Sequence, residues 1–201
     1  MDHDRPAPAE AAQTTGRPMR ADARRKRDAV LAAAVDVFVE RGVNVALDEV
    51  ARRAGVGIAT LYRHFPTREA LITGVYVREI DLLCDGVDAL LAELPPDEAL
   101  ITWMQRVIEY VAGKPGMPVA LKAIVVATDS DAAQNSHQRI YAALRQLMNA
   151  AADAGIIRTD ITVDDMAGAL SGLTLISGQP GSQARSNRLV ALLVDGLRRA
   201  G

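Results

Sequence analysis

The segment from Ile58 to His64 holds side chains of three kinds, and each kind suits a different part of a DNA double helix. It carries hydrogen-bonding groups, groups that can reach phosphates, and apolar groups that can touch thymine methyls. The residues concerned are Ile58, Ala59, Thr60, Tyr62, Arg63 and His64. In an exposed helix in a major groove, the N-terminal residues of this segment would lie nearest to the base edges.

Glycine and proline positions define the helix that carries these residues. Gly55 separates it from a short helix over residues 47–54, and Pro66 ends it because the residue before a proline is driven out of helical geometry. A longer helix over residues 21–40, ended by Gly42, precedes both. Two short helices joined at a glycine and braced by a longer one predict a helix-turn-helix. The apolar residues Val50, Ala51, Ala54, Val56, Leu61 and Phe65 would then face Leu31, Val35 and Phe38.

Charge is distributed unevenly along the chain, although the net charge is only −2. Residues 17–68 hold 11 Lys and Arg against 6 Asp and Glu, a balance of +5, and residues 69–201 hold 11 against 16, a balance of −5. The balance of residues 1–16 is −2. A basic segment on an acidic remainder indicates that the first part meets a polyanion, with a solvated charged face as the alternative.

These motifs resemble a known family. The stretch EVARRAGVGIATLYRHF over residues 49–65, followed by TREAL over residues 67–71, is similar to the signature of the TetR family of bacterial repressors. Residues 33–42, with Phe38 and Gly42, match as well. The resemblance is strong from Arg24 to Leu71, and the order of nine predicted helices extends it over the whole chain.

The resemblance implies a homodimer that binds a palindromic, double-stranded operator and is released by a small-molecule effector bound in its C-terminal domain. It also implies roles for single residues. Thr60 and Ala59 would face bases, while Tyr62 and His64 would hold phosphates.

Three further basic residues are expected at the DNA by the same resemblance. Arg68 lies where the family often has a phosphate-contacting lysine, and Arg24 and Arg25 lie where the first helix approaches the DNA backbone. The full set of expected DNA-binding residues is Arg24, Arg25, Ile58, Ala59, Thr60, Tyr62, Arg63, His64 and Arg68.

The chain departs from the family pattern at four positions. Val45 and Ala46 stand where a phosphate-binding Ser or Thr is common, and Gly57 and Ile58 stand where Ser and Lys are common. These changes remove polar contacts and favour an apolar contact between Ile58 and thymine methyls.

Each singled-out residue also has a plain structural interpretation. The Tyr62 ring could pack on the domain, and His64 could be a partly buried residue at a helix end. Arg52 and Arg53 are interpreted as solvated surface residues rather than as base readers.

The rest of the chain predicts further helices and no strand, so the fold class is all-α. We expect a tail over residues 1–16, a DNA-binding domain over residues 17–66, and an effector-binding and dimerisation domain over residues 67–201. Tail residues 1–16 hold few large apolar groups and are expected to be disordered. The later helices are predicted over residues 67–91, 97–112, 119–128, 131–154, 162–176 and 185–199. Thr67 and Thr162 are expected helix N-caps.

The last two predicted helices are apolar on more than one face, which a helix that covers a core on one side does not need. Their stripes are expected to form the dimer interface as a four-helix bundle, and the alternative is a monomer with a deeply buried last helix. The interface residues would be Met166, Leu170, Leu173, Leu189, Leu193 and Leu197.

The middle helices carry the residues that the resemblance assigns to an effector pocket. These are Trp103, Met104, Val107, Tyr110, Leu121, Ile124, Val125, His137 and Tyr141. His137 and Tyr141 are four residues apart and share a helical face, where they could bind a ligand. Plain core packing is the alternative for the apolar residues, and a surface turn is the alternative for His137.

Other classes of protein find little support. The chain has three His and one Cys, with no metal-ligand spacing, phosphate loop or nucleophile elbow, so no enzyme activity, cofactor or metal is expected. A helical module that binds a protein partner remains the second alternative. The lone Cys84 and the absence of a long apolar run or apolar leader predict a cytoplasmic chain with no membrane partner.

Overall fold

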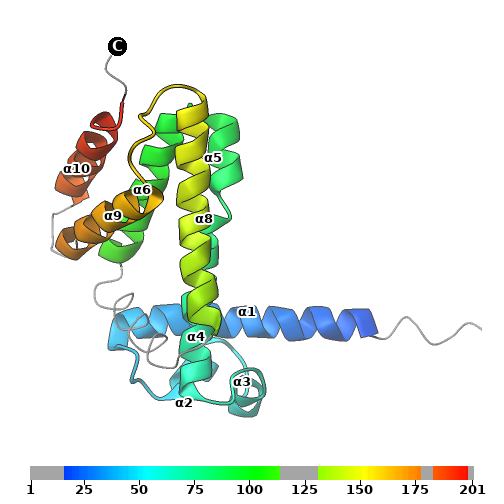
Figure 1. Cartoon of the computed structure of the whole chain (residues 1–201). Helices are drawn as coiled ribbons and strands as arrows, with labels where there is room; N and C mark the ends of the chain where they lie inside the picture. Colours follow the sequence, from blue (N-terminus) through cyan, green and yellow to red (C-terminus); the bar gives the residue numbers. More distant parts are fainter. Residues whose placement is uncertain (1–15, 114–130, 178–182, 199–201) are drawn as a thin grey trace, which may run out of the picture.

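The computed structural model describes residues 16–113, 131–177 and 183–198, and most of these residues are helical (Figure 1). Within these ranges there is no β-strand, only one isolated bridge between Ile157 and Arg198. The predicted all-α fold class is therefore confirmed. The predicted tail lies outside the described residues except for Gly16, and the helix predicted over residues 119–128 lies wholly outside them.

The N-terminal end of the molecule consists of α1 (Gly16–Arg41), α2 (Leu47–Arg53) and α3 (Ile58–His64). Gly42 and Gly55 follow the first two helices with φ values of 80° and 67°, a region that suits glycine because it lacks a Cβ. The predicted bounds of α3 are those of the structure, whereas α1 begins earlier than predicted. The expected apolar residues pack together, namely Leu31, Val35, Phe38, Val50, Ala51, Leu61 and Phe65, with Ala54 and Val56 partly buried against them.

The single helix predicted over residues 67–91 is wrong. The structure has α4 (Arg68–Cys84) and α5 (Val87–Glu93), separated at Asp85 and Gly86. A glycine weakens a helix, and the change of direction lets α5 bury Val87 and Leu90 in the larger core. The predicted N-cap of α4 is confirmed, because the Thr67 side chain accepts a hydrogen bond of 3.1 Å from the Ala70 amide.

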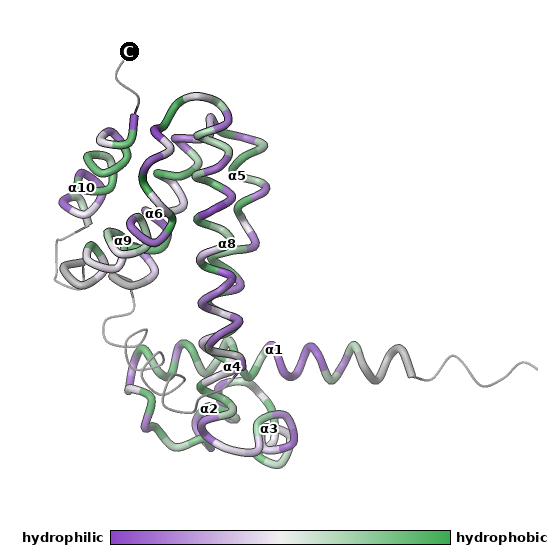
Figure 2. The backbone as a smooth tube through the Cα atoms, in the orientation of Figure 1, coloured by the Kyte–Doolittle hydropathy of each residue, from purple (hydrophilic) through white to green (hydrophobic). Residues whose placement is uncertain are grey.

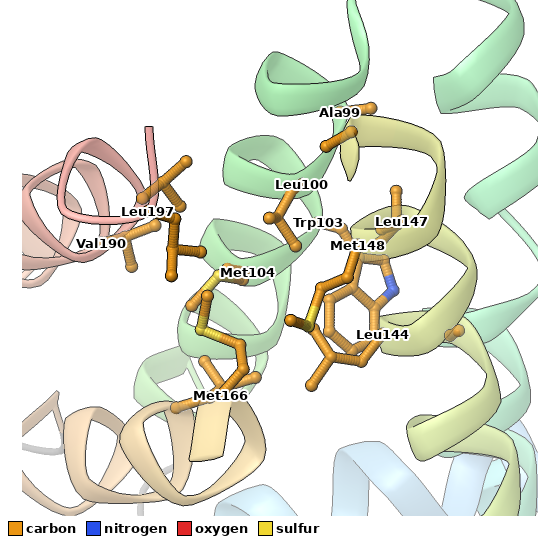
Figure 3. Packing of buried hydrophobic residues seen from close by; sticks show 14 of the residues in the cluster. Ala99, Leu100, Trp103, Met104, Leu144, Leu147, Met148, Met166, Val190 and Leu197 are labelled. Carbon is orange, nitrogen blue, oxygen red and sulfur yellow. The ribbon is translucent and has the colours of Figure 1, made fainter. Parts of the chain in front are cut away.

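A larger core holds the C-terminal helices together, and Figure 3 shows its centre. The helices are α6 (Pro96–Gly113), α8 (Asp131–Asp153), α9 (Val163–Ser177) and α10 (Gln183–Asp195). Trp103 of α6 is fully buried between them, and its indole Nε1 donates a hydrogen bond of 2.8 Å to the carbonyl oxygen of Leu83. The cap predicted at Thr162 is confirmed: its hydroxyl accepts from the Asp165 amide, and the Asp165 carboxylate accepts from the Thr162 amide.

The long helices α4 and α8 pack side by side and join the two ends of the molecule (Figure 1). One end of α4 packs on α1, and it starts only three residues after α3 ends. A short segment, residues 65–67, therefore connects α3 to α4. None of the described helices is both long and apolar enough to span a membrane.

Candidate nucleic-acid interface

Helix α3 presents nearly all of its side chains to solvent. Leu61 is its one buried residue and anchors it to the small core. Ile58 is 37% exposed and Tyr62 is 48% exposed, so both large side chains can contact a partner. Ala59 and Arg63 are exposed as well, while Thr60 and His64 are half-buried. The structure thus brings together on one short helix the six residues that the sequence singled out there.

The turn before α3 fixes how the helix stands on the domain. The amide of Val56 donates to the carbonyl of Ala51 over 3.0 Å, which closes the turn around Gly55. Ala51 is buried, and its small side chain lets α2 and α3 approach closely. The amide of Thr60 donates to the carbonyl of Gly57, so that the first turn of α3 is hydrogen-bonded without a side-chain cap.

The structure bears on the plain interpretations of Tyr62 and His64 in opposite ways. The Tyr62 ring is about half exposed and does not belong to the core of the domain. His64 is half-buried, and its ring centroid lies 6.4 Å from that of Phe65. The interpretation of a partly buried histidine at a helix end therefore fits His64, while Tyr62 is available to a partner.

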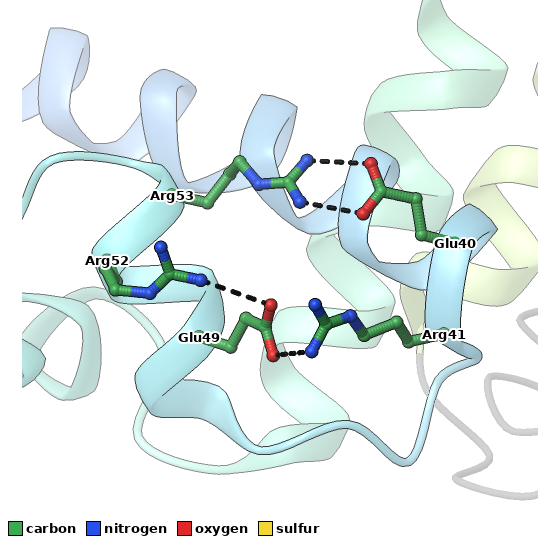
Figure 4. Close-up of polar contacts among 5 residues, drawn as sticks. All are labelled: Glu40, Arg41, Glu49, Arg52 and Arg53. Carbon is green, nitrogen blue, oxygen red and sulfur yellow. Dashed lines mark hydrogen bonds and ion pairs between the residues drawn. The ribbon is translucent and has the colours of Figure 1, made fainter.

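Ion pairs on the surface of α1 and α2 occupy three arginines of the DNA-binding end (Figure 4). Arg53 donates two hydrogen bonds to the Glu40 carboxylate, at 2.9 and 2.7 Å, and these bonds lower the pKa of Glu40 below its usual range. Glu49 binds both Arg41, at 2.6 Å, and Arg52, at 3.3 Å. Arg41 and Arg53 tie α1 to α2 on the surface, and Arg52 pairs within α2. These contacts agree with the interpretation that Arg52 and Arg53 are not base readers.

Arg68 serves the domain in a way that the sequence did not indicate. Its Nη1 donates to the carbonyl oxygens of Val43 and Val45, at 3.0 and 2.6 Å, from the first turn of α4 to the loop before α2. The side chain is partly buried and braces that loop. The phosphate contact expected of Arg68 stays a prediction, and it would compete with these two hydrogen bonds.

A cavity of about 190 Å³ lies between α4, α6, α8 and α9. Four of the expected pocket residues line it, namely Val107, Tyr110, His137 and Tyr141. The sequence missed its other described lining residues, which are Tyr76, Ile80, Leu83, Ile140, Leu144, Ala167, Leu170, Ser171 and Thr174. The spacing of Tyr76, Ile80 and Leu83 on one face of α4 was the available signal.

Two of the expected pocket residues are placed elsewhere, and three cannot be placed. Trp103 and Met104 are fully buried in the larger core and do not line the cavity, so for them the plain core interpretation is the right one (Figure 3). Leu121, Ile124 and Val125 lie outside the described residues.

The described lining of the cavity is mostly apolar, with polar groups from three tyrosines, His137, Ser171 and Thr174, and it includes no Asp, Glu, Lys or Arg. Burial raises the pKa of the Tyr110 hydroxyl well above its usual range, and the nearby Glu79 carboxylate acts in the same direction. Burial also raises the pKa of Tyr76. Both phenols therefore stay protonated at neutral pH and can donate a hydrogen bond. His137 and Tyr141, with ring centroids 4.5 Å apart, lie side by side on α8, and His137 is exposed to solvent.

A second hollow, of about 530 Å³, lies on the surface of α9 and α10. Its described lining is apolar apart from Asp165 and consists of Ile161, Met166, Ala169, Leu173, Leu189, Leu192, Leu193, Gly196 and Leu197. Leu192, which was not among the expected interface residues, is 68% exposed. Five expected interface residues line this groove, but Leu170 lines the inner cavity instead.

Three of the expected interface residues are already buried within one chain. Met166, Leu170 and Leu197 are at most 5% exposed, because they hold α9 and α10 against α6 and α8. The predicted apolar stripes of α9 and α10 thus contain both core residues and surface residues. Spacing along the helix alone did not distinguish the two kinds. Leu173, Leu189 and Leu193 are only partly buried and remain available at the groove.

Comparison with known proteins gives one family for both ends of the chain. A family model described as bacterial regulatory proteins of the tetR family matches residues 30–75, and one described as the SbtR-like transcriptional regulator C-terminal domain matches residues 95–199. Among solved structures, the TetR transcriptional regulator SCO0520 from Streptomyces coelicolor is 50% identical with a TM-score of 0.74, over 87% of this chain and 99% of that chain. The TetR transcription regulatory protein from Mycobacterium vanbaalenii is 35% identical with a TM-score of 0.70, over 90% and 100%.

Curated relatives match over about a third of the chain. The HTH-type transcriptional activator FasR of Mycolicibacterium smegmatis is 44% identical over 63 residues, which are 31% of this chain and 29% of FasR. The match thus spans less than a third of that relative. The likeness of the whole chain therefore rests on the two solved structures and on the C-terminal family model.

Proposed function

This chain belongs to the TetR family of bacterial transcriptional regulators, and we propose that it is a homodimeric repressor released from a palindromic operator by a small-molecule effector. The observation that carries the proposal is the exposed surface of α3, where Leu61 alone is buried. A helix held in this way can enter a major groove without unfolding any part of the domain.

The side chains at the start of α3 and those further along it are expected to contact different parts of the DNA. Ile58, Ala59 and Thr60 stand at its N-terminal end, where contact with thymine methyls and base edges is expected. Tyr62 and Arg63 are exposed further along the helix and would hold phosphates. Phosphate contacts fix the position of the helix, and base contacts select the sequence.

The groove of α9 and α10 supports the homodimer. Leu192 is 68% exposed in the middle of an apolar surface, and such patches mark interaction sites. Gly168 and Gly172 on α9 have no described atom near the position of a Cβ, so a second backbone can approach them. A two-fold dimer through this groove would place two copies of α3 on one DNA, and successive major grooves are about 34–36 Å apart.

The cavity supports release by an effector, because α4 forms one of its walls and starts beside α3. Arg139 of α8 holds α4 by binding the carboxylates of Asp81 and Asp85. A ligand that favours a wider spacing of α4 and α8 would strain this contact and shift the position of α3. The population would then move away from the form that fits the operator.

The proposed direction of regulation is repression. FasR is named an activator, but the similarity covers only 63 residues, which are 29% of that protein. We propose repression because a bound dimer covers its operator physically, whereas activation needs an additional contact with the transcription machinery.

Selection of bound fragments from random duplex DNA tests the proposal. A repressor of this kind should enrich a palindrome, and a reporter promoter that contains the palindrome should be silenced in cells that express the protein. A variant with Thr60→Val and Tyr62→Ala, two surface changes on α3, serves as the control and should enrich nothing. Enrichment of a single, asymmetric half-site would refute the dimer, and an increase of reporter expression would refute repression. Failure to bind any duplex would favour the alternative of a module that binds a protein.

A further inference from the structure

The cavity between α4, α6, α8 and α9 has an apolar end and a polar end. Its lining residues Ile80, Leu144 and Leu170 are at most 5% exposed. His137 of α8 and Ser171 of α9, which also line the cavity, are exposed. Figure 2 shows that the end of α8 nearer α1, which holds His137, is hydrophilic. The cavity is therefore closed over apolar side chains, and its polar residues lie towards solvent.

Two contacts between α4 and α6 place their tyrosines at the same end of the cavity. The Trp103 indole of α6 donates a hydrogen bond to the Leu83 carbonyl of α4. Seven residues later on α6, Tyr110 is close enough to Tyr76, seven residues earlier on α4, for Tyr76 to act with burial in raising its pKa. The two helices are therefore antiparallel, and the Tyr76 end lies about two helical turns from Leu83.

The surroundings of the cavity favour an uncharged ligand. Its described lining includes no Asp, Glu, Lys or Arg, and burial of an ion without an oppositely charged partner is costly. Glu79 is only 4% exposed and lies close enough to Tyr110 to affect its pKa. This carboxylate would repel an anion in the cavity. It already pairs with Arg78, at 3.5 Å, so it is a poor partner for a cation.

The polar residues of the cavity can both accept and donate hydrogen bonds. The Ser171 hydroxyl donates to the carbonyl oxygen of Ala167 at 2.8 Å, and the Thr174 hydroxyl donates to that of Ser171 at 2.7 Å. Each hydroxyl has a single proton, so both oxygens can only accept from a ligand. Burial raises the pKa of Tyr76, which keeps its proton and can donate. A ligand hydroxyl, which is a donor and an acceptor, matches this combination.

The volume of the cavity suits one ring with a short chain. It measures about 190 Å³. Drug-sized ligands occupy pockets of about 300–1,000 Å³, whereas an apolar cavity of about 150 Å³ can bind benzene. The rings of Tyr76, Tyr110 and Tyr141 line the cavity, and aromatic rings pack favourably against one another in offset or edge-to-face arrangements.

We propose that this cavity binds an uncharged, single-ring aromatic alcohol and discriminates against carboxylates and ammonium ions of the same size. The ring would lie against the buried apolar residues, and the hydroxyl would lie near Tyr76, Ser171 and Thr174. By volume, the ligand has about ten non-hydrogen atoms. The inference rests on the proposed effector site, but not on DNA binding by α3 or on the direction of regulation.

Probes of matched size test the ligand class. Phenylpropanol, phenylpropanoate and phenylpropylammonium each carry the ring and the polar group at opposite ends of a three-carbon chain, and propylbenzene lacks the polar group. Each probe is titrated into the full-length protein near neutral pH by isothermal titration calorimetry. Ser171→Ala with Thr174→Val removes the two acceptors, and Val107→Phe fills part of the cavity. The matched control is Thr102→Val, because Thr102 is a half-buried helical residue that does not line the cavity.

Phenylpropanol should bind wild type with a Kd of about 1 mM or lower, as expected for a ligand of this size. It should bind at least about tenfold more tightly than either ion, because neither ion finds an unpaired opposite charge. The double variant should weaken phenylpropanol by roughly three- to tenfold, the effect of one hydrogen bond, and leave propylbenzene unchanged. Val107→Phe should weaken both of these probes, and Thr102→Val should bind them like wild type. Thermal unfolding checks that each variant is folded.

The ligand class is overturned if either ion binds as tightly as phenylpropanol, or if phenylpropanol gives no binding heat at several millimolar. Unchanged phenylpropanol binding by the double variant would place the probe outside this cavity and would also overturn it. Operator affinity, measured by fluorescence anisotropy with and without phenylpropanol, tests the proposed function separately. Selective binding of the alcohol with unchanged operator affinity would support the ligand class and refute release by a ligand in this cavity.

Discussion

Replacing Arg68 by Met should destabilise the DNA-binding end without removing a DNA contact. The guanidinium Nη1 makes two hydrogen bonds, at 3.0 and 2.6 Å, to the carbonyl oxygens of Val43 and Val45. Hydrogen bonds that involve a charged group contribute about 1.5–3 kcal/mol each when buried. Both bonds share one nitrogen, and the side chain is only partly buried, so we expect a total loss of about 2 kcal/mol. In a chain of this size that corresponds to a fall in Tm of roughly 4–8 °C.

Thermal unfolding together with salt-dependent operator binding distinguishes this brace from the phosphate contact that the sequence predicted. For Arg68→Met we expect the lower Tm and an unchanged slope of log affinity against log salt. Arg63→Met is the matched comparison, because Arg63 is exposed on α3. It should leave Tm unchanged and make the slope shallower by about 1. An Arg68→Met protein with wild-type Tm and a shallower slope would refute the brace and restore the phosphate contact.

Three further substitutions or measurements test the other parts of the molecule. Tyr62→Ala should weaken binding to all DNA sequences by about 1–3 kcal/mol with little change in Tm, because the ring is half exposed; unchanged binding would remove Tyr62 from the interface. Leu192→Asp should convert the proposed dimer to a folded monomer in analytical ultracentrifugation. Leu192 lines the apolar groove and is 68% exposed in one chain, so the new carboxylate would be buried only on dimerisation; a stable dimer would place the interface elsewhere. Burial raises the pKa of the Cys84 thiol to about 11 from 9.0, so the native thiol should react with Ellman's reagent at about pH 8 roughly 100-fold more slowly than the unfolded one. Equal rates would show that Cys84 is accessible. The same shift destabilises the fold as pH rises from 9.0 towards 11, where the unfolded thiol ionises first.

Local chemistry made much of the DNA-binding end predictable. Gly55 and Pro66 bound α3 because one allows the turn and the other cannot continue a helix, and Leu61 marks the buried side by its spacing. The caps at Thr67 and Thr162 depend only on residues three positions away. Each of these features is set within one or two helical turns.

The sequence alone therefore determined an all-α fold, the position and exposed face of the reading helix, and the family. Only the tertiary structure decided that Trp103 belongs to the core while Tyr110 lines a cavity, that the helix after Thr67 ends at Cys84, and that Arg68 braces a loop more than twenty residues away. The physical reason is that spacing along a helix fixes which residues share a face. The residues that pack against that face come from distant parts of the chain. How closely they pack decides whether the face lies in a core, lines a cavity or stays open as a groove.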